Sequence, residues 1–240
     1  MTPIPLFVGY DDRESAVFHV WNQTVLDQTS APVAIVPLHV DMLADFDGQQ
    51  DGTNRFIYSR YLVPSLMEFS GWAAYVDGDM VLRDDLKRLW DLRDFTKAVQ
   101  VVQHDYITQH RRKFIGTPIE NDNVHYPRKN WSSVILWNCG HPKNRILTPD
   151  IVAASGGKFL HRFEWLDDED IGALPSEWNH LVTEQHGDNA KIAHFTLGAP
   201  GFQHYIHCKY SAEWHRALMR VLRMVGEKPT DMVERSFRSI

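Results

Sequence analysis

The sequence is poor in cysteine, carries no excess of basic residues and lacks long apolar runs. It has two cysteines, Cys139 and Cys208, and no Cys-x-x-Cys pair, which excludes a disulfide framework and argues against a sulfur-ligated zinc cluster. A single bridge between them stays open, and the low count fits a reducing cytoplasm. The formal net charge of −6, from 25 Lys and Arg against 31 Asp and Glu, argues against a general nucleic-acid binder but is compatible with a local basic patch.

Long apolar segments are also missing. No run approaches the roughly 18 apolar residues of a membrane-spanning helix, so we expect no transmembrane segment. The first residues, MTPIPLFVGYDDRE, have neither a basic start nor a long apolar core, and they predict a strand rather than a signal peptide. The 240 residues are 43% hydrophobic and 23% charged, which is ordinary for a soluble protein and favours one domain with a sizeable core.

Apolar, β-branched runs alternate along the chain with segments of helical spacing. This alternation predicts an α/β fold with a mostly parallel central sheet. We expect strands at residues 4–10, 33–40, 72–76, 98–104, 133–138 and 190–196. We expect helices at residues 15–28, 54–70, 84–92, 148–157 and 211–228. Pro64 should kink the second helix or split it into two, and the polar stretch 104–130 predicts a mobile loop.

Two of these helices carry explicit boundary signals. Asp84 or Asp85 is expected to begin the helix at 84–92. For the helix near residue 150, Thr148 is the expected cap, Pro149 the first residue and Gly156 the stop. These are local signals, and they predict where helices begin and end without depending on distant residues.

Polar clusters fall where three predicted strands end: YDD after the first strand, DGD after WAAYV, and HFT at the end of AKIAHFT. In parallel α/β sheets, ligands collect at the carboxyl ends of the strands. Asp77 and Asp79 repel each other unless a cation lies between them, and Gly78 lets the backbone turn tightly and a ligand approach. Carboxylates suit Mg²⁺ or Mn²⁺ shared with phosphates, so we predict a divalent ion holding a diphosphate; a solvated Asp-Gly turn is the alternative.

The central segment FIYSRYLVPSL…WAAYVDGDMVLRDDLKRLW resembles retaining, nucleotide-sugar-dependent glycosyltransferases of the GT-A fold, family 8 type. That family has Tyr-x-Arg on a helix, a strand ending in Asp-x-Asp, and then a short acidic helix. The likeness continues in FVGYDDRE, NWSSVILWN, WLDDEDIGALPSEWN and AHFTLGAPGF. It therefore covers most of the chain and implies a single GT-A domain over residues 1–210, followed by an amphipathic helix and tail at 211–240.

The resemblance also implies roles for individual residues. It assigns the metal to Asp77, Asp79 and His194, and the imidazole favours Mn²⁺ over Mg²⁺; on its own, His194 would read as a core or loop histidine. It assigns catalytic roles at the donor sugar to Asp168, Glu169 and Arg60; an acidic helix start for the first two and a surface ion pair for Arg60 are the alternatives. Contacts to the nucleotide-sugar donor are implied for Gly9, Tyr10, Asp11, Tyr58, Gly78, Ser132, Ser133 and Gly198.

The sequence departs from the family pattern at two places. Glu169 replaces the family's Gln, and the last block, HFTLGAPGF, keeps Gly198 and Pro200 but lacks the Lys that reaches the diphosphate. Another cation must then assist the leaving group. The candidates in the polar stretch are Arg111, Arg112, Lys113, Arg128 and Lys129.

The implied reaction transfers a hexose from a nucleotide sugar, by family habit a UDP-hexose, to a hydroxyl of a glycan, a lipid-linked glycan or another acceptor. Retention of configuration is implied; we favour attack from the leaving group's own face, with Asp168 stabilising the transition state. A nucleotidyltransferase is one alternative, but GYDDRE is acidic and poor in glycine, unlike the phosphate loop of such enzymes. A catalytically silent nucleotide-sugar-binding domain is another, since the family's Lys is missing.

The C-terminal helix has an apolar face with Trp214, Leu218, Met219 and Leu222, and arginines on another face. It predicts either a helix that caps the domain or a peripheral contact with an anionic membrane. The expected location is the cytoplasm, with the membrane's inner surface as the site of any such contact.

Overall fold

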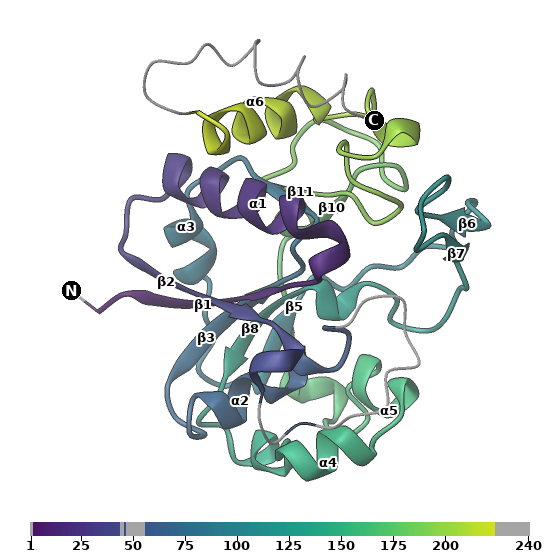
Figure 1. The fold of residues 1–240 in the computed structure, drawn as a ribbon. Coiled ribbons are helices and arrows are strands. Elements are labelled where there is room, and N and C mark those ends of the chain that lie inside the picture. Colours follow the sequence, from purple (N-terminus) through teal and green to yellow (C-terminus); the bar gives the residue numbers. More distant parts are fainter. Residues whose placement is uncertain (1, 44–45, 47–55, 224–240) are drawn as a thin grey trace.

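A six-stranded sheet forms the centre of the protein in a computed structural model that describes residues 2–43, 46 and 56–223 (Figure 1). In the sheet, β8 runs antiparallel to both of its neighbours, while the other adjacent pairs are parallel. The predicted α/β class with a mostly parallel sheet is therefore confirmed. In spatial order the strands are β2 (Val33–Leu38), β1 (Ile4–Gly9), β3 (Trp72–Val76), β8 (Val134–Asn138), β5 (Val99–Val101) and β9 (Ile171–Ala173).

A second, three-stranded sheet lies beside the first and corrects one expectation. The late strand predicted at 190–196 is β11 (Ile192–His194), and it does not join the central sheet. It pairs in parallel with β10 (His180–Leu181) and antiparallel with β4 (Met80–Leu82). Because β4 follows β3 after only three residues, this sheet attaches directly to the carboxyl end of the central strand.

Helices cover both faces of the central sheet (Figure 1). On one face lie α1 (Ser15–Gln28) and α3 (Leu86–Trp90), whose buried side chains, Trp21 and Leu89 among them, join one apolar core. On the other face lie α2 (Val63–Leu66), α4 (Pro149–Ala154) and α5 (Gly157–His161). Alternate residues of β3 serve the two cores, since a strand points successive side chains to opposite faces.

The helix boundaries predicted from local signals are confirmed with one exception. Pro64 splits its segment into a 3-10 helix at Ser59–Leu62 and the short α2, and the Asp85 carboxylate caps α3 by accepting from the Lys87 N–H. Thr148 caps α4 as expected. Gly156, however, is not its stop: α4 ends at Ala154, and Gly156 is instead the N-cap of α5. Residues 54–55 of the predicted helix lie outside the described residues.

The stretch 104–130, predicted as a mobile loop, is mostly irregular but contains a small hairpin, and its mobility stays a prediction. Its strands are β6 (Arg112–Lys113) and β7 (Asn121–Asp122), paired antiparallel. The two cysteines are both free, so the bridge that the sequence left open does not form.

The C-terminal helix α6 (Ser211–Val221) packs on α1 (Figure 1). Trp214 and Ala217 are buried there, and the Arg220 guanidinium lies 3.2 Å from Asp27 Oδ1 of α1. This packing agrees with a capping helix. Peripheral membrane contact and the boundary after residue 210 stay predictions, and residues 224–240 lie outside the described part of the chain. Among the described helices, none has the length and apolar character needed to cross a bilayer.

Candidate active site

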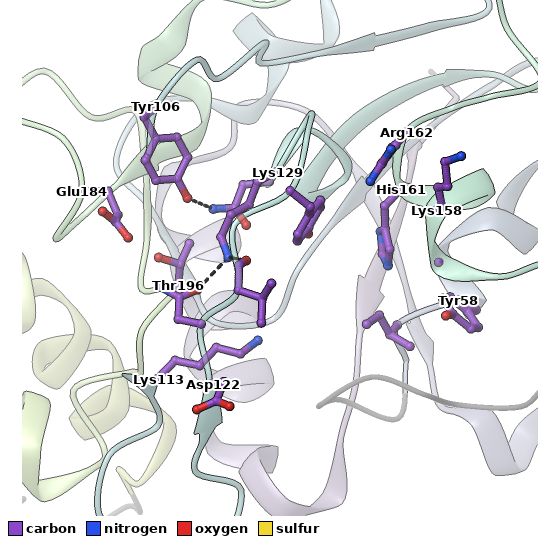
Figure 2. Close-up of a pocket in the computed structure, with 16 residues that line it drawn as sticks. Tyr58, Tyr106, Lys113, Asp122, Lys129, Lys158, His161, Arg162, Glu184 and Thr196 are labelled. Atoms are coloured by element: carbon purple, nitrogen blue, oxygen red, sulfur yellow. Dashed lines mark hydrogen bonds between the residues drawn. The ribbon is translucent and has the colours of Figure 1, made fainter. Parts of the chain in front are cut away.

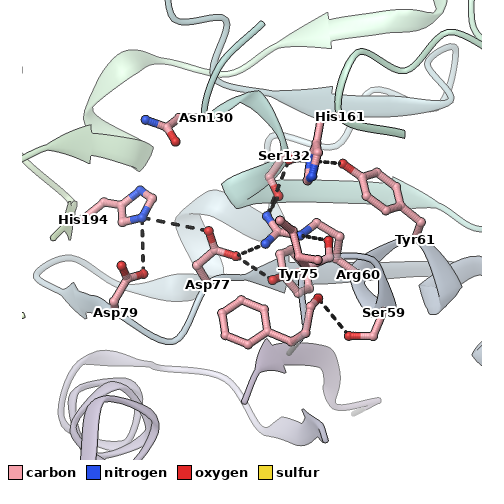
Figure 3. Close-up of polar contacts among 12 residues, drawn as sticks. Ser59, Arg60, Tyr61, Tyr75, Asp77, Asp79, Asn130, Ser132, His161 and His194 are labelled. Carbon is pink, nitrogen blue, oxygen red and sulfur yellow. Dashed lines mark hydrogen bonds and ion pairs between the residues drawn. The ribbon is translucent and has the colours of Figure 1, made fainter. Parts of the chain in front are cut away.

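The side chains of Asp77, Asp79 and His194 meet in a buried cluster (Figure 3). One ligand atom from each lies within 4.8 Å of the others. His194 Nε2 is 3.3 Å from Asp79 Oδ1 and 3.9 Å from Asp77 Oδ2. The structure thus brings His194 together with two aspartates that lie more than a hundred positions earlier in the sequence, as the resemblance implied.

Strand pairing explains this convergence. All residues of β3 are buried, and the chain emerges at Asp77, whose N–H donates to the Ser133 carbonyl at 2.9 Å. In the second sheet, His194 of β11 lies opposite Met80 of β4, and the Phe195 N–H donates to the Asp79 carbonyl at 2.9 Å. The antiparallel ladder therefore fixes the imidazole beside the second aspartate.

Gly78 has a steric reason to be glycine. A Cβ there would lie 2.7 Å from the carbonyl oxygen of Gly9, the last residue of β1. Since the obstacle is backbone, the Gly78→Ala variant must shift one of the two segments. We expect it to lower the free energy of unfolding by about 1–3 kcal/mol in a chemical denaturation experiment.

Gly140→Ala is the matched control for this prediction. A Cβ at the exposed Gly140 meets its nearest neighbour at an ordinary 3.7 Å, so this variant should unfold close to wild type. Equal denaturation midpoints for the two variants would contradict the close approach at Gly78.

Asp77 is held by its surroundings through one oxygen. Its Oδ1 accepts from the Tyr75 hydroxyl at 2.6 Å and lies 3.0 Å from Arg60 Nη2. Arg60 is itself buried, and its Nη1 donates to the Ser132 carbonyl at 2.8 Å. Burial acts to lower the pKa of Arg60, but the Asp77 carboxylate and the neighbouring tyrosines together outweigh it and keep the pKa above its ordinary value. Arg60 therefore stays charged, and Asp77 Oδ2 is left facing His194.

A hydrogen-bond chain orients His194. Its Nδ1 lies 2.8 Å from Asn179 Oδ1, and Asn179 Nδ2 donates to the Asn130 carbonyl at 3.0 Å. Because the amide nitrogen of Asn179 is the donor to Asn130, its oxygen accepts, and Nδ1 of His194 carries the proton. The lone pair on Nε2 then points toward the two aspartates, which is the tautomer that a metal-binding histidine needs.

The donor set fits a divalent metal. Two carboxylates and one imidazole nitrogen, all buried and within reach of one ion, match Mn²⁺ better than Ca²⁺. Asp77 Oδ2, Asp79 and His194 Nε2 are the atoms that would hold it. Binding of the metal itself stays a prediction.

Lys113 is the cation of the polar stretch that reaches this cluster. It lines the same small pocket as Asp77, Asp79 and His194, about 90 Å³ in volume. Burial lowers the pKa of Lys113, and the carboxylates of Asp79 and Asp77 oppose that shift. Of the other candidates, Arg112 pairs with Glu120 and Asp122, Arg128 pairs with Asp168, and neither they nor Arg111 and Lys129 line this pocket.

The β6–β7 hairpin carries Lys113 into place by docking on the HFTLG segment. The Phe114 N–H donates to the Leu197 carbonyl at 2.6 Å, and the Ile115 N–H donates to the Tyr205 hydroxyl at 3.1 Å. Gly198, at φ +150°, lets the Tyr205 ring pack against its backbone, where a Cβ would overlap the ring. Gly198 thus contributes to the site indirectly, by making room for Tyr205, whose hydroxyl holds the hairpin.

The metal pocket opens beside a larger cavity of about 390 Å³ (Figure 2). Tyr58, Tyr106 and Tyr126 supply aromatic walls to the cavity. The two share Ile57, Lys113, Tyr126, Asn130, His161 and Thr196 as lining residues.

His161 is an uncharged hydrogen-bond donor that lines both the metal pocket and the larger cavity. Its Nδ1 lies 2.8 Å from the Tyr61 hydroxyl and 3.1 Å from Ser132 Oγ (Figure 3). Burial, then the nearby Arg60, lowers the pKa of His161 to about 3. With Nδ1 accepting, the N–H is on Nε2. No local signal marks His161, which lies on α5 and not in any of the blocks that resemble the family.

The remaining residues implied for donor binding occupy two regions. Ser132 and Ser133 are buried and line the metal pocket. Tyr10 stacks on His39 with ring centroids 4.9 Å apart, and the Asp11 carboxylate is held by Arg13 through its backbone N–H at 3.0 Å and its guanidinium. Binding of the nucleoside at Gly9, Tyr10 and Asp11 stays a prediction.

The structure does not bring Asp168 and Glu169 to the cluster. Both are exposed, neither lines the metal pocket or the larger cavity, and Asp168 Oδ1 pairs with Arg128 Nη2 at 2.5 Å. They precede β9, which runs parallel to β3, whereas Asp77 follows β3. A turn that precedes one strand and a turn that follows a parallel strand begin at opposite ends of the strands.

A buried carboxyl that the sequence did not single out is Glu14, which precedes α1. Its Oε2 has no hydrogen-bond partner among the described residues, and burial, followed by the charge of Asp79, raises the pKa of Glu14 to about 8. In the sequence it resembles any acidic helix start, so no local signal marks it.

No model of a known protein family matches the sequence. Protein CDI of Arabidopsis thaliana is 40% identical to it over 224 residues, which make up 88% of this chain and 85% of that protein. The chain belongs to the Protein CDI family.

Several solved structures that are similar to this Protein CDI relative are glycosyltransferases. The bifunctional glycosyltransferase WbbM has a TM-score of 0.63 at 12% identity, over 90% of this chain and 50% of WbbM. The galactosyltransferase LgtC, solved with donor and acceptor sugar analogues, has a TM-score of 0.56 at 13% identity, over 93% of this chain and 98% of LgtC. GlyE of Streptococcus pneumoniae TIGR4 has a TM-score of 0.56 at 11% identity, over 99% of this chain and 64% of GlyE.

The chain thus spans half of WbbM and 64% of GlyE. At these identities the likeness establishes the fold. The predicted GT-A fold of this Protein CDI relative is confirmed, and membership of family 8 stays a prediction.

Proposed function

We propose that the chain is a metal-dependent glycosyltransferase that moves a hexose from a nucleotide sugar, with UDP-hexose as the favoured donor, to an acceptor hydroxyl with retention of configuration. The observation that carries this proposal is the buried cluster of Asp77, Asp79 and His194, with Lys113 beside it and a larger cavity next to it. The glycosyltransferase neighbours agree with it at the level of fold.

The donor's diphosphate would lie at this cluster. When bound there, Mn²⁺ supplies positive charge that neutralises the departing diphosphate. Lys113 provides the second cation, in place of the Lys that the HFTLGAPGF block lacks. Arg60 orients Asp77 through an ion pair, and Asn179 keeps the Nε2 lone pair of His194 available.

Retention by attack from the leaving group's own face agrees with the pocket's chemistry. Among its lining residues, the carboxylates are Asp77 and Asp79, which the metal would occupy, so none is left over to form a covalent intermediate. In this route the donor's anomeric C–O bond breaks, the acceptor oxygen bonds to that carbon, and its proton passes to the departing diphosphate. Asp168 is exposed and would act only at a distance.

The test is a panel of UDP-glucose, UDP-galactose, UDP-N-acetylglucosamine and GDP-mannose, each with and without Mn²⁺. Thermal shift reports binding, and release of the nucleoside diphosphate reports hydrolysis or transfer. Manganese-dependent hydrolysis of one donor supports the proposal. Binding without any hydrolysis would point to a silent binding domain, and diphosphate release from a nucleoside triphosphate with a sugar phosphate would point to a nucleotidyltransferase.

Lys113→Gln should lower kcat/KM for the donor about tenfold to 100-fold, because a hydrogen bond between two charged groups is lost at the leaving diphosphate. Steady-state kinetics at fixed Mn²⁺ measures this effect. Lys87→Gln is the matched control, since Lys87 lies on the surface of α3 and pairs with Asp91. Wild-type kinetics in the Lys113 variant would remove this residue from the diphosphate site.

A cytoplasmic location and the kind of acceptor stay predictions.

A further inference from the structure

The cavity of about 390 Å³ has basic walls in a protein whose net charge is −6. Its lining includes four cationic side chains against two acidic ones. The cationic residues are Lys113, Lys129, Lys158 and Arg162, and the acidic residues are Asp122 and Glu184. The positive charge is therefore local to this cavity.

Of these four cations, only Lys158 has an ion-pair partner among the described residues, and that pair is long and exposed. Arg162 makes no ion pair within the described part of the chain, and Lys158 Nζ is 3.8 Å from Glu164 Oε1. Lys129 Nζ donates to two uncharged oxygens, Asn123 Oδ1 at 2.7 Å and the Val124 carbonyl at 2.6 Å. Burial, then repulsion from Lys113, lowers the pKa of Lys129 to about 8.

The two acidic groups of the cavity contact residues other than the four cations. Asp122 Oδ1 is 2.9 Å from Arg112 Nη1, outside the set of cavity cations, and Glu184 Oε1 accepts from the Thr108 hydroxyl at 2.5 Å. Neither of them forms an ion pair with a lysine or arginine of the cavity. An excess of positive charge in a half-enclosed space favours an anionic ligand.

The donor's diphosphate accounts for only part of this charge. Lys113 lines both the metal pocket and the larger cavity, whereas Lys158 and Arg162 line the larger cavity alone. Figure 2 shows Lys158 and Arg162 together on the α5 side of the cavity, across from Lys113 and Lys129. These two side chains therefore lie beyond the place that the diphosphate takes.

We propose that the acceptor carries an anionic group, a phosphate ester or a carboxylate, which Arg162 and Lys158 bind while its hydroxyl faces the metal pocket. This inference rests on the proposed glycosyltransferase function. A guanidinium forms paired hydrogen bonds with either group, and the tyrosines of the same cavity offer faces to a sugar ring. A neutral glycan would leave these cations without a ligand.

The test compares sugars matched in all but charge. Glucose, glucuronate and glucose 6-phosphate are titrated by calorimetry into the full chain, with Mn²⁺ and the nucleoside diphosphate of the active donor at saturation. The saturated diphosphate site cannot then take the added anion. We expect one or both anionic sugars to bind about tenfold or more tightly than glucose. The carboxylate and phosphate arms distinguish the two chemistries.

Arg162→Gln and Lys158→Gln should each reduce the ratio of anionic to neutral affinity, and Lys87→Gln should leave it unchanged. The ratio is measured within one protein, so partial unfolding does not alter it. Equal affinity for the three sugars, or no binding of either anion at millimolar concentration, would overturn this inference while donor hydrolysis still stood. Absence of manganese-dependent hydrolysis of every donor would overturn the proposed function, and this inference with it.

Discussion

Replacing Asp79 with asparagine is expected to lower the manganese-dependent turnover of the nucleotide sugar by roughly 10²–10³-fold or more, the scale on which a single electrostatic group supports a developing charge. Asparagine keeps the shape of the side chain but removes the negative charge next to His194 Nε2. The fold should survive, because the contacts that anchor this segment are backbone hydrogen bonds such as Phe195 N–H to the Asp79 carbonyl. Rates at saturating Mn²⁺ and a thermal melt measure the two effects.

Two further variants, Asp91→Asn and Asp77→Asn, are compared with Asp79→Asn. Asp91→Asn removes a surface carboxylate that pairs with Lys87 and should leave turnover unchanged. Asp77→Asn should lose turnover and also stability, since it strips the buried Arg60 of its ion-pair partner. Wild-type-like turnover in Asp79→Asn would remove the metal site from the reaction.

Glu14→Gln is expected to stabilise the metal-free protein at alkaline pH. The pKa of Glu14 is about 8 in the folded chain, through burial and the nearby Asp79, against an ordinary value of 4.5. Between these values the folded state binds more protons than the unfolded state, so stability falls as pH rises through this window. Glutamine has no proton to lose. The variant should therefore gain on the order of a few kcal/mol relative to wild type between pH 5 and pH 8.

Urea denaturation at the two pH values, in the presence of EDTA, measures this gain. EDTA matters because a bound divalent cation would favour the charged carboxylate and mask the effect. Glu68→Gln is the control, since Glu68 is exposed. The same pH dependence in Glu14→Gln and wild type would show that the Glu14 carboxyl does not hold its proton in the fold.

Short-range signals allowed the sequence to predict much of the fold. β3 is a continuous apolar run, and the caps Thr148 and Asp85 act through contacts two or three residues away, so both could be identified from local order. The prediction that Gly156 ends α4 was wrong because α5 begins shortly after α4 ends, and a glycine can end one helix or begin the next. The prediction that β11 joins the central sheet was wrong because the length and apolar content of a strand do not reveal which sheet it joins.

The candidate site, too, could be predicted from the sequence only in part. Asp77 and Asp79 are marked by their spacing after β3, but the position of Lys113 depends on the hairpin docking at Leu197 and Tyr205, which no local pattern encodes. Asp168 shows the opposite failure. Its acidic block looks catalytic in sequence, yet the turn precedes β9 and leaves the carboxylate exposed beside Arg128.

The most direct measurement is an electron paramagnetic resonance titration of Mn²⁺ into the full chain, with and without the nucleoside diphosphate of the active donor, on protein carrying ¹⁵N-labelled histidine. We predict one bound Mn²⁺ per chain whose spectrum shows a histidine nitrogen, tightened by the nucleotide and lost in His194→Ala. Free manganese at all concentrations, or a bound ion unaffected by the His194 variant, would contradict the metal-held diphosphate.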